Sequence, residues 1–413
     1  LSSAASDVYK RQKLTISGNT LTSIGSKAFE NAALLADVYA EPTTAPAVQA
    51  DSFSGAGTSV QGSKTFHVAS VEAYSSWTTA ASGYTMEALG PDYLSEGLYY
   101  RASGEDPWKS EIPQTFTTLY VKTAGDNTVM TAEQMKAVAD AVKALAAPAT
   151  VDFSEVVYES ETFPNSFKSN ANLAGIVFPQ NVTKTASAAF QKTGMTSVTL
   201  LKGISYGSNA FDSCASLVSV TVEEGVTEIG NYMFQNTKLT DVTLPNSVTK
   251  IGASAFNGCS LTTINFGQGV KTIENSAFQN CGELTEIILP DATETLGQNA
   301  FGDCPKLAKI SLGKNMKTLE AYCFVGYSKG CPLLGDIICR ATTPPTLKDD
   351  YGTGPFGGGW SPVAGKDVPA ENRIIHLPKS ADPVGGTGAY ADSSWVKLTS
   401  STYGFAFKYD VEG

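Results

Sequence analysis

The side chains best suited to acid–base or nucleophilic chemistry are few and scattered in this chain of 413 residues. Its two histidines, His67 and His376, lie far apart in the sequence. Asp349 and Asp350 form an adjacent carboxylate pair near Gly352, where loop acids are usually solvated. No HExxH zinc motif, GxSxG nucleophile elbow, Walker loop or EF-hand loop occurs. We therefore predict no catalytic, metal-binding or cofactor-binding residue, and no cofactor.

Seven cysteines could in principle support disulfide, zinc or redox chemistry: Cys214, Cys259, Cys281, Cys304, Cys323, Cys331 and Cys339. Their number is odd and no close CxxC pair is present, which argues against a disulfide scaffold and a zinc site. The first four each follow a repeated Phe by three residues, and Thr193, Thr237 and Tyr327 take that place in other repeats. We interpret the position as a buried ladder of reduced thiols. A local disulfide between Cys323 and Cys331 is an open alternative.

The secondary-structure elements that would position any site are expected to recur with a repeated sequence motif that contains phenylalanine. Eight of the 19 phenylalanines come after a small or apolar residue and before a short polar stretch: Phe29, Phe190, Phe211, Phe234, Phe256, Phe278, Phe301 and Phe324. From Phe190 onward the gaps are 21, 23, 22, 22, 23 and 23 residues. Such a period is typical of stacked-repeat proteins, which usually bind partners along an extended surface.

The coil that starts at Leu239 shows the physical pattern of one repeat. Val242 and Leu244 alternate with polar residues, which predicts a half-buried strand. Gly252 permits a turn that a side chain would hinder. Phe256 places a ring in the core, where full burial contributes about 1.5–3 kcal/mol. One coil cannot bury its own apolar face, so neighbouring coils must stack with their strands about 4.8 Å apart.

Two phrases, LTDVTLPNSVTKIGASAFNGCS and LTEIILPDATETLGQNAFGDCP, resemble the leucine-rich repeat of the BspA-type bacterial surface-protein family. The resemblance extends over residues 173–332. It implies a leucine-rich-repeat solenoid, a right-handed and strand-rich β/α superhelix with a parallel concave sheet and coils of about 22–23 residues. It also implies an extracellular or cell-surface location and the binding of a protein partner, such as a host or matrix protein.

A longer segment occurs twice. Leu334, Asp336, a proline pair, Phe356, His376, Tyr390 and Trp395 repeat the order of Leu35, Asp37, Pro46, Phe53, His67, Tyr74 and Trp77. We interpret the two segments as copies of one closing unit, which places the histidines at equivalent positions in separate caps. Each histidine is therefore expected to be structural or exposed to solvent.

A strand–helix–strand cap is predicted before the main repeats. Strand-like residues 117–122 and 150–156 flank a helical pattern that opens with the capping box Thr131–Gln134 and ends at Pro148. The predicted organisation is a fragment start or non-native segment (1–13), the last coil and cap of an upstream repeat unit (14–78), a connector (79–114), an N-terminal cap (115–165), about seven repeats (166–332), an irregular C-terminal cap (333–396) and a tail (397–413).

Composition excludes several partners. The formal net charge is −11, and no Lys/Arg block is present, so nucleic acid and anionic membranes are not expected as main partners. No apolar run reaches the roughly 18 residues that would span a bilayer. The chain begins with Leu1 and lacks the apolar core of a leader, so the surface location rests on the family resemblance alone.

Two sets of residues are candidates for partner binding. On the strands, Asp241, Thr243, Thr263 and Asn265 flank inward residues on a face rich in Ser and Thr that lacks aromatic residues and Arg. In the loops, aromatic anchors are offered by Tyr351, Phe356 and Trp360 in the cap insertion and by Tyr99, Tyr100 and Trp108 in the connector. Our hypothesis is that a partner contacts the loop aromatics, because hot spots favour Trp and Tyr. The alternative is that these rings fill the cap's own core.

The resulting prediction is a non-catalytic, surface-exposed or secreted repeat protein that mediates adhesion or protein–protein interaction. One alternative is a carbohydrate-associated accessory module, and another is a scaffold in a larger enzyme whose catalytic domain lies outside this chain. The sequence does not indicate the oligomeric state.

Overall fold

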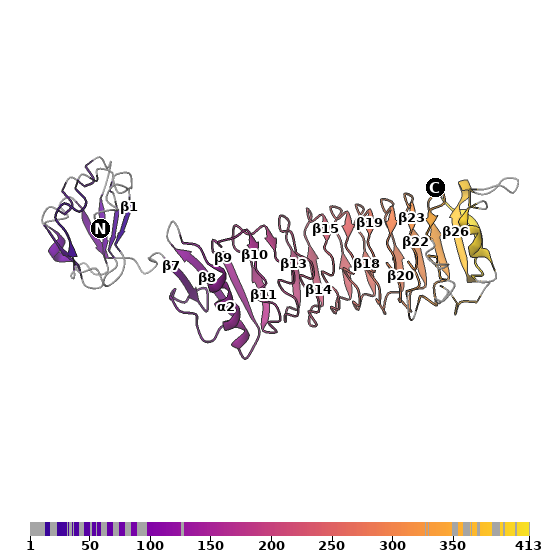
Figure 1. The fold of residues 1–413 in the computed structure, drawn as a ribbon, viewed down its shortest axis with the longest axis horizontal. Helices are drawn as coiled ribbons and strands as arrows, with labels where there is room; N and C mark the ends of the chain where they lie inside the picture. The colour runs from indigo at the N-terminus through magenta and orange to yellow at the C-terminus, as the bar shows by residue number, and fades with distance from the viewer. Residues whose placement is uncertain are drawn as a thin grey trace. The chain divides into compact units, whose positions relative to one another are not determined.

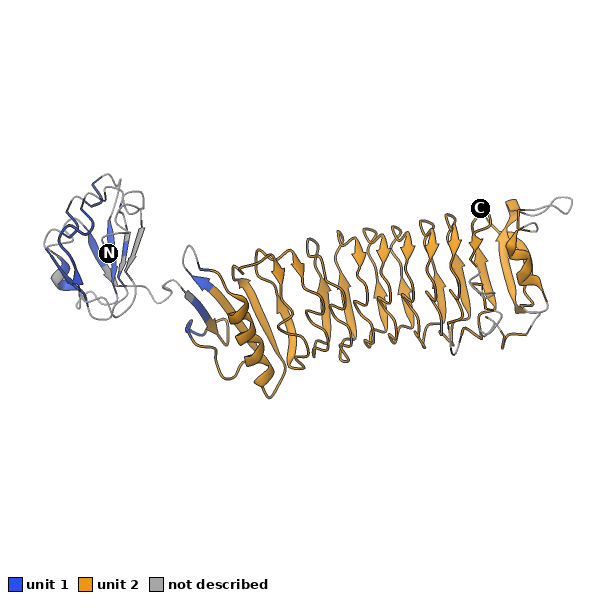
Figure 2. Cartoon of the chain, viewed as in Figure 1, with its two compact units in different colours: residues 1–99, 106–110, 123–128 blue, residues 100–105, 111–122, 129–413 orange. Residues whose placement is uncertain are grey.

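The fold is described from a computed structural model of residues 1–413 (Figure 1). It describes the following residues: 13–16, 23–30, 32, 35, 37–40, 45–49, 52–54, 56–58, 64–68, 74–78, 84–88, 97–124, 128–326, 328, 330–348, 354–357, 364, 366–369, 372–381, 389–390, 393–400 and 403–412. The chain forms two compact units (Figure 2). Unit 1 comprises residues 1–99, 106–110 and 123–128, and unit 2 comprises residues 100–105, 111–122 and 129–413.

Unit 2 is a solenoid of short parallel strands, as predicted, and these strands form two ladders (Figure 1). The first ladder contains β11 (Leu173–Val177), β13 (Ser197–Leu200), β14 (Ser219–Val222), β16 (Asp241–Thr243), β18 (Thr263–Asn265), β20 (Glu286–Ile288), β22 (Lys309–Leu312) and β24 (Asp336–Cys339). The second contains β10 (Thr162–Phe163), β12 (Lys184–Thr185), β15 (Glu228–Ile229), β17 (Lys250–Ile251), β19 (Thr272–Ile273), β21 (Thr295–Leu296), β23 (Thr318–Leu319) and β25 (Thr346–Leu347).

The two ladders differ in continuity. In the second ladder, the strands from β15 to β25 form one unbroken six-stranded sheet, and β10 and β12 form a separate pair. The first is divided further: β11 belongs to a separate sheet, and the other strands form the pairs β13–β14 and β16–β18 and a five-stranded sheet that begins at β20. Within each pair the register is strict, so that Asp241 lies opposite Thr263 and Thr243 opposite Asn265. Equivalent residues of successive coils therefore form columns along the solenoid.

The repeated phenylalanines form a continuous column of stacked rings in the core. From Phe190 to Phe324, successive ring centroids are 5.2–6.4 Å apart and the ring planes differ by only 5–19°. All seven rings are almost completely buried. Centroid separations in this range are favourable for aromatic pairs. The column confirms that the sequence period marks the core.

The backbone around each of these phenylalanines forms a third set of contacts between coils. The Phe190 N–H donates to the carbonyl of Ala210 at 2.9 Å, and the Phe256 N–H donates to that of Ala277 at 2.8 Å. The residue two places before Phe256, Ser254, has φ of 54°. The equivalent residue is also left-handed in the other coils of the column: Ala188, Asn209, Tyr232, Ser276, Asn299 and Tyr322. A left-handed L-residue costs about 1–2 kcal/mol, which the hydrogen bonds and ring packing must offset.

The cysteines form the expected buried ladder. All seven are free thiols and buried. Cys214 Sγ donates to the Phe190 carbonyl at 3.1 Å, and Cys259 Sγ to the Phe234 carbonyl at 3.1 Å. Cys331 Sγ donates in the same way to the Phe301 carbonyl at 3.2 Å.

The place of the thiol in the last of these coils differs from the sequence interpretation. Cys331 supplies the thiol that donates to the Phe301 carbonyl in this coil, and it follows Phe324 by four more residues than the other thiols follow their phenylalanines. Tyr327 itself lies outside the described residues. The extra loop is held by Asp303, whose carboxylate accepts the backbone N–H groups of Ser328 and Gly330 at 2.9 Å. Cys323 donates elsewhere, to the Glu320 carbonyl.

The predicted strand–helix–strand cap opens unit 2. Helix α2 (Ala132–Ala144) begins with the predicted capping box, in which Thr131 Oγ1 accepts the Gln134 N–H at 3.3 Å and Gln134 Oε1 accepts the Thr131 N–H at 2.8 Å. The strands β8 (Thr118–Ala124) and β9 (Ala149–Glu155) flank it and pair in parallel. They belong to a sheet of order β11-β9-β8-β7. Its outermost strand, β7 (Gly97–Arg101), comes from the segment expected to be a connector.

The C-terminal cap continues the first ladder. β26 (Ile374–Pro378) pairs with β24, and β27 (Ala406–Val411) pairs with β26. The short helices η3 (Lys379–Ala381) and η4 (Ser394–Thr399) follow β26. The indole N–H of Trp395 in η4 donates to the Pro345 carbonyl at 2.8 Å. The segment 397–413, expected only as a tail, thus contains the last strand of this sheet.

Unit 1 shows the same construction in its described residues. β1 (Lys13–Ile16), β3 (Asp37–Ala40), β5 (Thr65–Val68) and β6 (Thr85–Ala88) form a parallel sheet. A second pair joins β2 (Ser23–Ile24) to β4 (Ala47–Val48), and η1 (Ser75–Thr78) follows β5. The Trp77 N–H in η1 donates to the Pro46 carbonyl at 2.8 Å, which matches the Trp395–Pro345 bond.

The thiol ladder predicts protection from alkylation. Burial raises the pKa of the Cys259 thiol to about 11, and it raises the pKa of Cys281, Cys323 and Cys331 well above the usual value. Only the thiolate attacks iodoacetamide. At pH 8 the folded protein should therefore remain unmodified by mass spectrometry, whereas all seven thiols should react in guanidinium without reductant. Five modified residues instead of seven in the denatured sample would reveal a disulfide.

The phenylalanine column predicts a large effect of truncation at its centre. Phe256→Ala should lower the free energy of unfolding by about 3–5 kcal/mol, because two stacked neighbours lose their partner and a cavity remains. Phe256→Leu, the matched control, keeps most of the apolar volume and should cost much less. Urea denaturation followed by circular dichroism measures both. A loss below 1 kcal/mol for the alanine variant would show that the column contributes little.

Candidate binding surface on the first ladder

Four of the predicted site residues form a compact polar array. Asp241 and Thr243 lie on β16, Thr263 and Asn265 lie on β18, and all four side chains are exposed. Their inward neighbour Val242 is buried in the core, which fixes the outward direction of the flanking side chains. We call this outer side of the first ladder the strand face. It offers hydroxyl, amide and carboxylate groups to a ligand.

A groove of about 410 Å³ lies beside this array, where β18 and β20 are not paired in the sheet. Thr263, Asn265 and Gln268 line it from one coil, and Glu286 and Ile288 line it from the next. Ile288 is 60% exposed, the largest value among the large hydrophobic residues that the structure describes as exposed. The groove therefore places one apolar side chain among hydrogen-bonding groups.

Arg340, which follows β24, closes one side of the groove. Its Nη2 donates to the Leu289 carbonyl at 2.7 Å, its Nε donates to the Leu312 carbonyl at 3.3 Å, and its Nη1 lies 3.2 Å from Asp291 Oδ1. The guanidinium thus joins three successive coils and holds the wall of the groove in place. The planar fork of donors suits Arg to this role.

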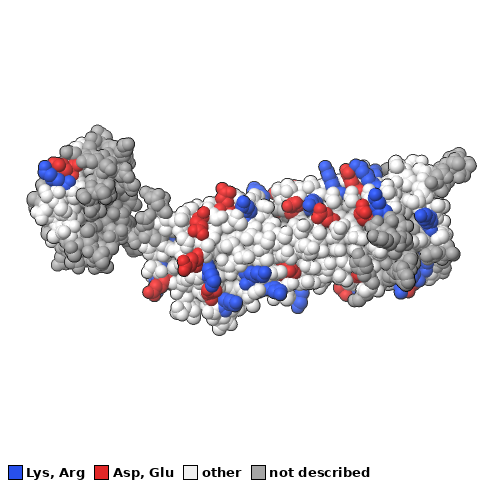
Figure 3. All heavy atoms as spheres, viewed as in Figure 1, with Lys and Arg blue, Asp and Glu red and all other residues white. Residues whose placement is uncertain are grey.

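Charges on unit 2 are mixed in sign. Several ion pairs join neighbouring coils, such as Lys309–Glu286 at 3.2 Å and Lys250–Glu274 at 3.0 Å. Figure 3 shows Lys and Arg interspersed with Asp and Glu along the visible face of the solenoid. Exposed pairs of this kind contribute little to stability, about 0–1 kcal/mol each.

The loop aromatics are less available than the sequence hypothesis requires. Phe356 is completely buried and packs against Phe324 with centroids 5.1 Å apart, so it belongs to the cap's own core. Tyr100 is 6% exposed, and burial raises its pKa to about 12. Tyr99 and Trp108 are half-buried. The remaining two candidates, Tyr351 and Trp360, lie outside the described residues.

The histidine of the C-terminal cap has acidic partners from two neighbouring strands. His376 Nδ1 lies 2.8 Å from Asp410 Oδ1 on β27, and its Nε2 lies 3.4 Å from Asp336 Oδ1 on β24. His67 is half-buried on β5, where its register partners are Tyr39 and Glu87. Within the described part of the chain, no group of three or more His, Cys, Asp and Glu side chains is arranged to hold a metal ion. In the same residues, no helix has the length and apolarity to cross a bilayer.

Comparison with known proteins assigns the repeats. Residues 151–206 and 204–330 match the sequence profile described as a BspA type leucine rich repeat region, in six copies. The repeat region belongs to the BspA-type leucine-rich repeats. No curated protein matches the chain.

Solved structures of bacterial leucine-rich-repeat proteins resemble the chain at low identity. The pneumococcal vaccine antigen PcpA is 17% identical, with 63% of this chain and 79% of that chain covered and a TM-score of 0.33. A leucine rich cell surface protein from Faecalibacterium prausnitzii is 18% identical, with coverages of 80% and 88% and a TM-score of 0.35. A leucine-rich repeat protein from Eubacterium ventriosum is 17% identical, with coverages of 84% and 88% and a TM-score of 0.33.

Sequence reasoning placed Thr263 and Asn265 correctly on the strand face but missed the groove beside them. Ile288 is apolar, whereas the equivalent residues of the neighbouring coils, Asn265 and Ser311, are polar. This difference in the sequence could have indicated the groove. The contribution of Arg340 to the groove could not be predicted from the sequence. Arg340 belongs to the C-terminal cap and contacts Leu289, which lies 51 positions earlier in the sequence.

Removing the Arg340 clamp should destabilise this end of the solenoid. Arg340→Leu leaves the Leu289 carbonyl without its guanidinium partner and should lower the free energy of unfolding by about 1–3 kcal/mol. Arg340→Lys, which keeps the charge but not the planar fork, should lose part of that amount. Hydrogen exchange read by mass spectrometry should show faster exchange in residues 286–291 of the leucine variant. Unchanged exchange there would show that the clamp does not hold the groove.

Proposed function

We propose that this chain is a non-catalytic binding protein whose strand face holds a segment of a protein partner. The observation that carries the proposal is the groove of about 410 Å³ between β18 and β20, in which exposed Ile288 lies among Thr263, Asn265 and Glu286. A groove with one apolar contact and several hydrogen-bonding groups suits a polypeptide, which presents both kinds of group. BspA-type repeats support this role, because stacked repeats offer an extended surface for partners.

The energetic contribution of the groove centres on Ile288. Complete burial of such a side chain contributes about 1.5–3 kcal/mol, and the fraction still exposed leaves roughly half of that for a partner to gain. The Arg340 clamp fixes the wall beside it, so that little ordering is required on binding. The neighbouring hydroxyl and amide groups would orient the bound partner segment by hydrogen bonding and would add less to its affinity.

The location and the kind of partner form the finer part of the proposal. We propose that the chain acts at the bacterial cell surface or after secretion and that it contributes to adhesion to a host or matrix protein. This part rests on the resemblance of the repeats to the BspA-type surface proteins. Residues 14–78, extended by β6 to residue 88, are proposed to close a second repeat unit, since their Trp77–Pro46 bond reproduces the Trp395–Pro345 bond.

Binding to immobilised host extracellular-matrix proteins, measured by biolayer interferometry, tests the function. We expect binding by the full chain and at least a 10-fold loss of affinity for Ile288→Ser. Val218→Ser is the matched control, because Val218 is 49% exposed outside the groove and should be dispensable. Equal binding by the Ile288 variant would overturn the assignment to the groove. Binding to glycans and to no protein would instead establish the carbohydrate-associated alternative.

A further inference from the structure

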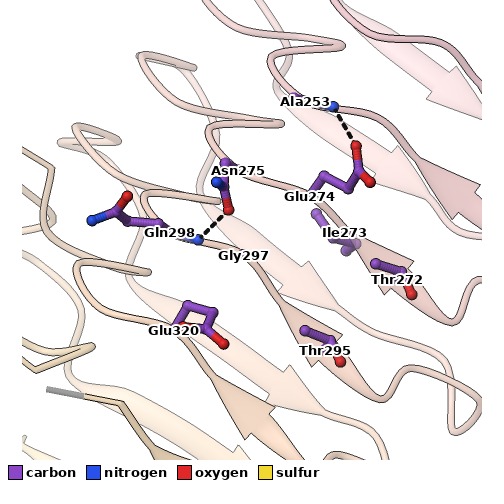
Figure 4. Close-up of a pocket in the computed structure, with 9 residues that line it drawn as sticks. All are labelled: Ala253, Thr272, Ile273, Glu274, Asn275, Thr295, Gly297, Gln298 and Glu320. Carbon is purple, nitrogen blue, oxygen red and sulfur yellow. Dashed lines mark hydrogen bonds between the residues drawn. The ribbon is translucent and has the colours of Figure 1, made fainter. Parts of the chain in front are cut away.

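A second groove, of about 490 Å³, lies over the second ladder and is separate from the strand face (Figure 4). It extends over β19, β21 and the turn after β23, all within the unbroken six-stranded sheet. Thr272 and Thr295 lie opposite each other in register along it, and both are half-buried. Glu274 and Glu320 lie on its two sides, with Gly297 between them in the stack.

The groove exists because the residue after the second strand alternates between Glu and Gly. In three successive coils this position is Glu274, Gly297 and Glu320. A Cβ atom on Gly297 would lie 2.6 Å from both the Asn275 nitrogen and the Glu274 carbonyl carbon, so that coil cannot carry a side chain here. Asn275 is close because its Oδ1 accepts the Gln298 N–H at 2.9 Å (Figure 4). The result is a notch one coil wide between two carboxylates.

The coil that contains Gly252 shows the same steric cause. A Cβ atom on Gly252 would lie 2.5 Å from Asn231 Oδ1, which accepts the Ala253 N–H at 2.9 Å. Beneath Glu274 and Glu320, the preceding coil has Ala253 or Gln298 at the position of this asparagine. A side chain is therefore tolerated at Glu274 and Glu320. Gly252 and Gly297 are therefore required by the close approach of the preceding coil, and not by the turn geometry expected from the sequence.

The two carboxylates differ in their partners. Glu274 Oε1 lies 3.0 Å from Lys250 Nζ, and its Oε2 accepts the Ala253 N–H at 3.1 Å (Figure 4). Glu320 forms no ion pair with any residue that the structure describes, although it is only half-exposed. Among the described residues, the notch thus combines one carboxylate that makes no ion pair, Glu320, with hydroxyl and amide groups that can accept hydrogen bonds.

We propose that this notch binds an arginine side chain of a partner protein, with Glu320 as the carboxylate that receives the guanidinium. Arg presents five donors in a planar fork and no acceptor, which complements a wall of carboxylate and hydroxyl oxygens. Two coils separate Glu274 from Glu320, about 10 Å by the strand spacing, which is too far for one metal ion to bridge. The guanidinium pairs bidentately with Glu320 and reaches the Thr295 hydroxyl. The proposal is independent of the strand-face groove.

A titration of the full chain with a defined peptide tests the site. The probe is acetyl-Gly-Arg-Gly-amide, followed by two-dimensional amide NMR, and the control probe carries citrulline, which has the same shape without the charge. We expect saturable shifts of the Gly297 and Gln298 amides with the arginine peptide and at least a 10-fold weaker response to citrulline. A lysine peptide should also bind more weakly, because it lacks the fork.

Two variants locate the effect. Glu320→Gln should weaken binding of the arginine peptide at least 10-fold, whereas Glu283→Gln, which alters an exposed glutamate paired with Lys306 outside the notch, should bind like the original chain. Circular dichroism spectra identical to that of the original chain would exclude misfolding as the cause. The proposal is overturned if no amide shifts, if citrulline or lysine peptides bind equally well, or if Glu320→Gln leaves binding unchanged.

Discussion

The requirement that each coil be completed by its neighbours governs this structure, and it is most evident at the phenylalanine turn. Each repeat Phe from Phe190 to Phe301 donates its N–H to the following coil, while its ring stacks on the next ring. The carbonyls of Phe190, Phe234, Phe256, Phe278 and Phe301 accept a thiol from the next coil. Several of these carbonyls also accept a backbone N–H from three residues later, as Phe256 does from Cys259 at 3.2 Å, so the thiol adds a hydrogen bond between coils. A buried thiol with this structural role has no need of reactivity. A solenoid of this kind is stable only as a stack.

Much of the stack was predictable from sequence because it depends on periodic constraints. The Phe period, the alternating strand residues and the Thr131–Gln134 box each follow from local rules, and the structure confirms them. The contacts that sequence reasoning missed depend on which coil lies beneath. Arg340 reaches back two coils to Leu289, and Gly297 is required only because Asn275 lies under it. A single sequence read along its length does not reveal which residues lie one above another in neighbouring coils.

The candidate site was predictable only in part for the same reason. The outward direction of Thr263 and Asn265 follows from strand alternation, whereas the missing pairing between β18 and β20 does not. The aromatic hypothesis failed for Phe356 because composition alone does not distinguish an exposed anchor from the last ring of a stack. The ring lies 5.1 Å from Phe324 and continues the column into the cap. Aromatic residues near the end of a repeat array are needed first to cover its open end.

The separation between the inner column and the outer faces explains how such a protein can vary its binding surface. Inner positions are constrained from both sides by adjacent coils, so substitution there weakens the stack. Outer positions each touch only one or two neighbours, so a change in one coil creates a local feature at little cost to stability. Exposed Ile288 is of this kind, because a single coil departs from its column while the rings beneath continue. At the notch, the coils on either side carry Glu274 and Glu320, whereas Gly297 is fixed by its close contact with Asn275. Binding sites on this fold should therefore be sought where an outer column is interrupted, and not where the repeat is most regular.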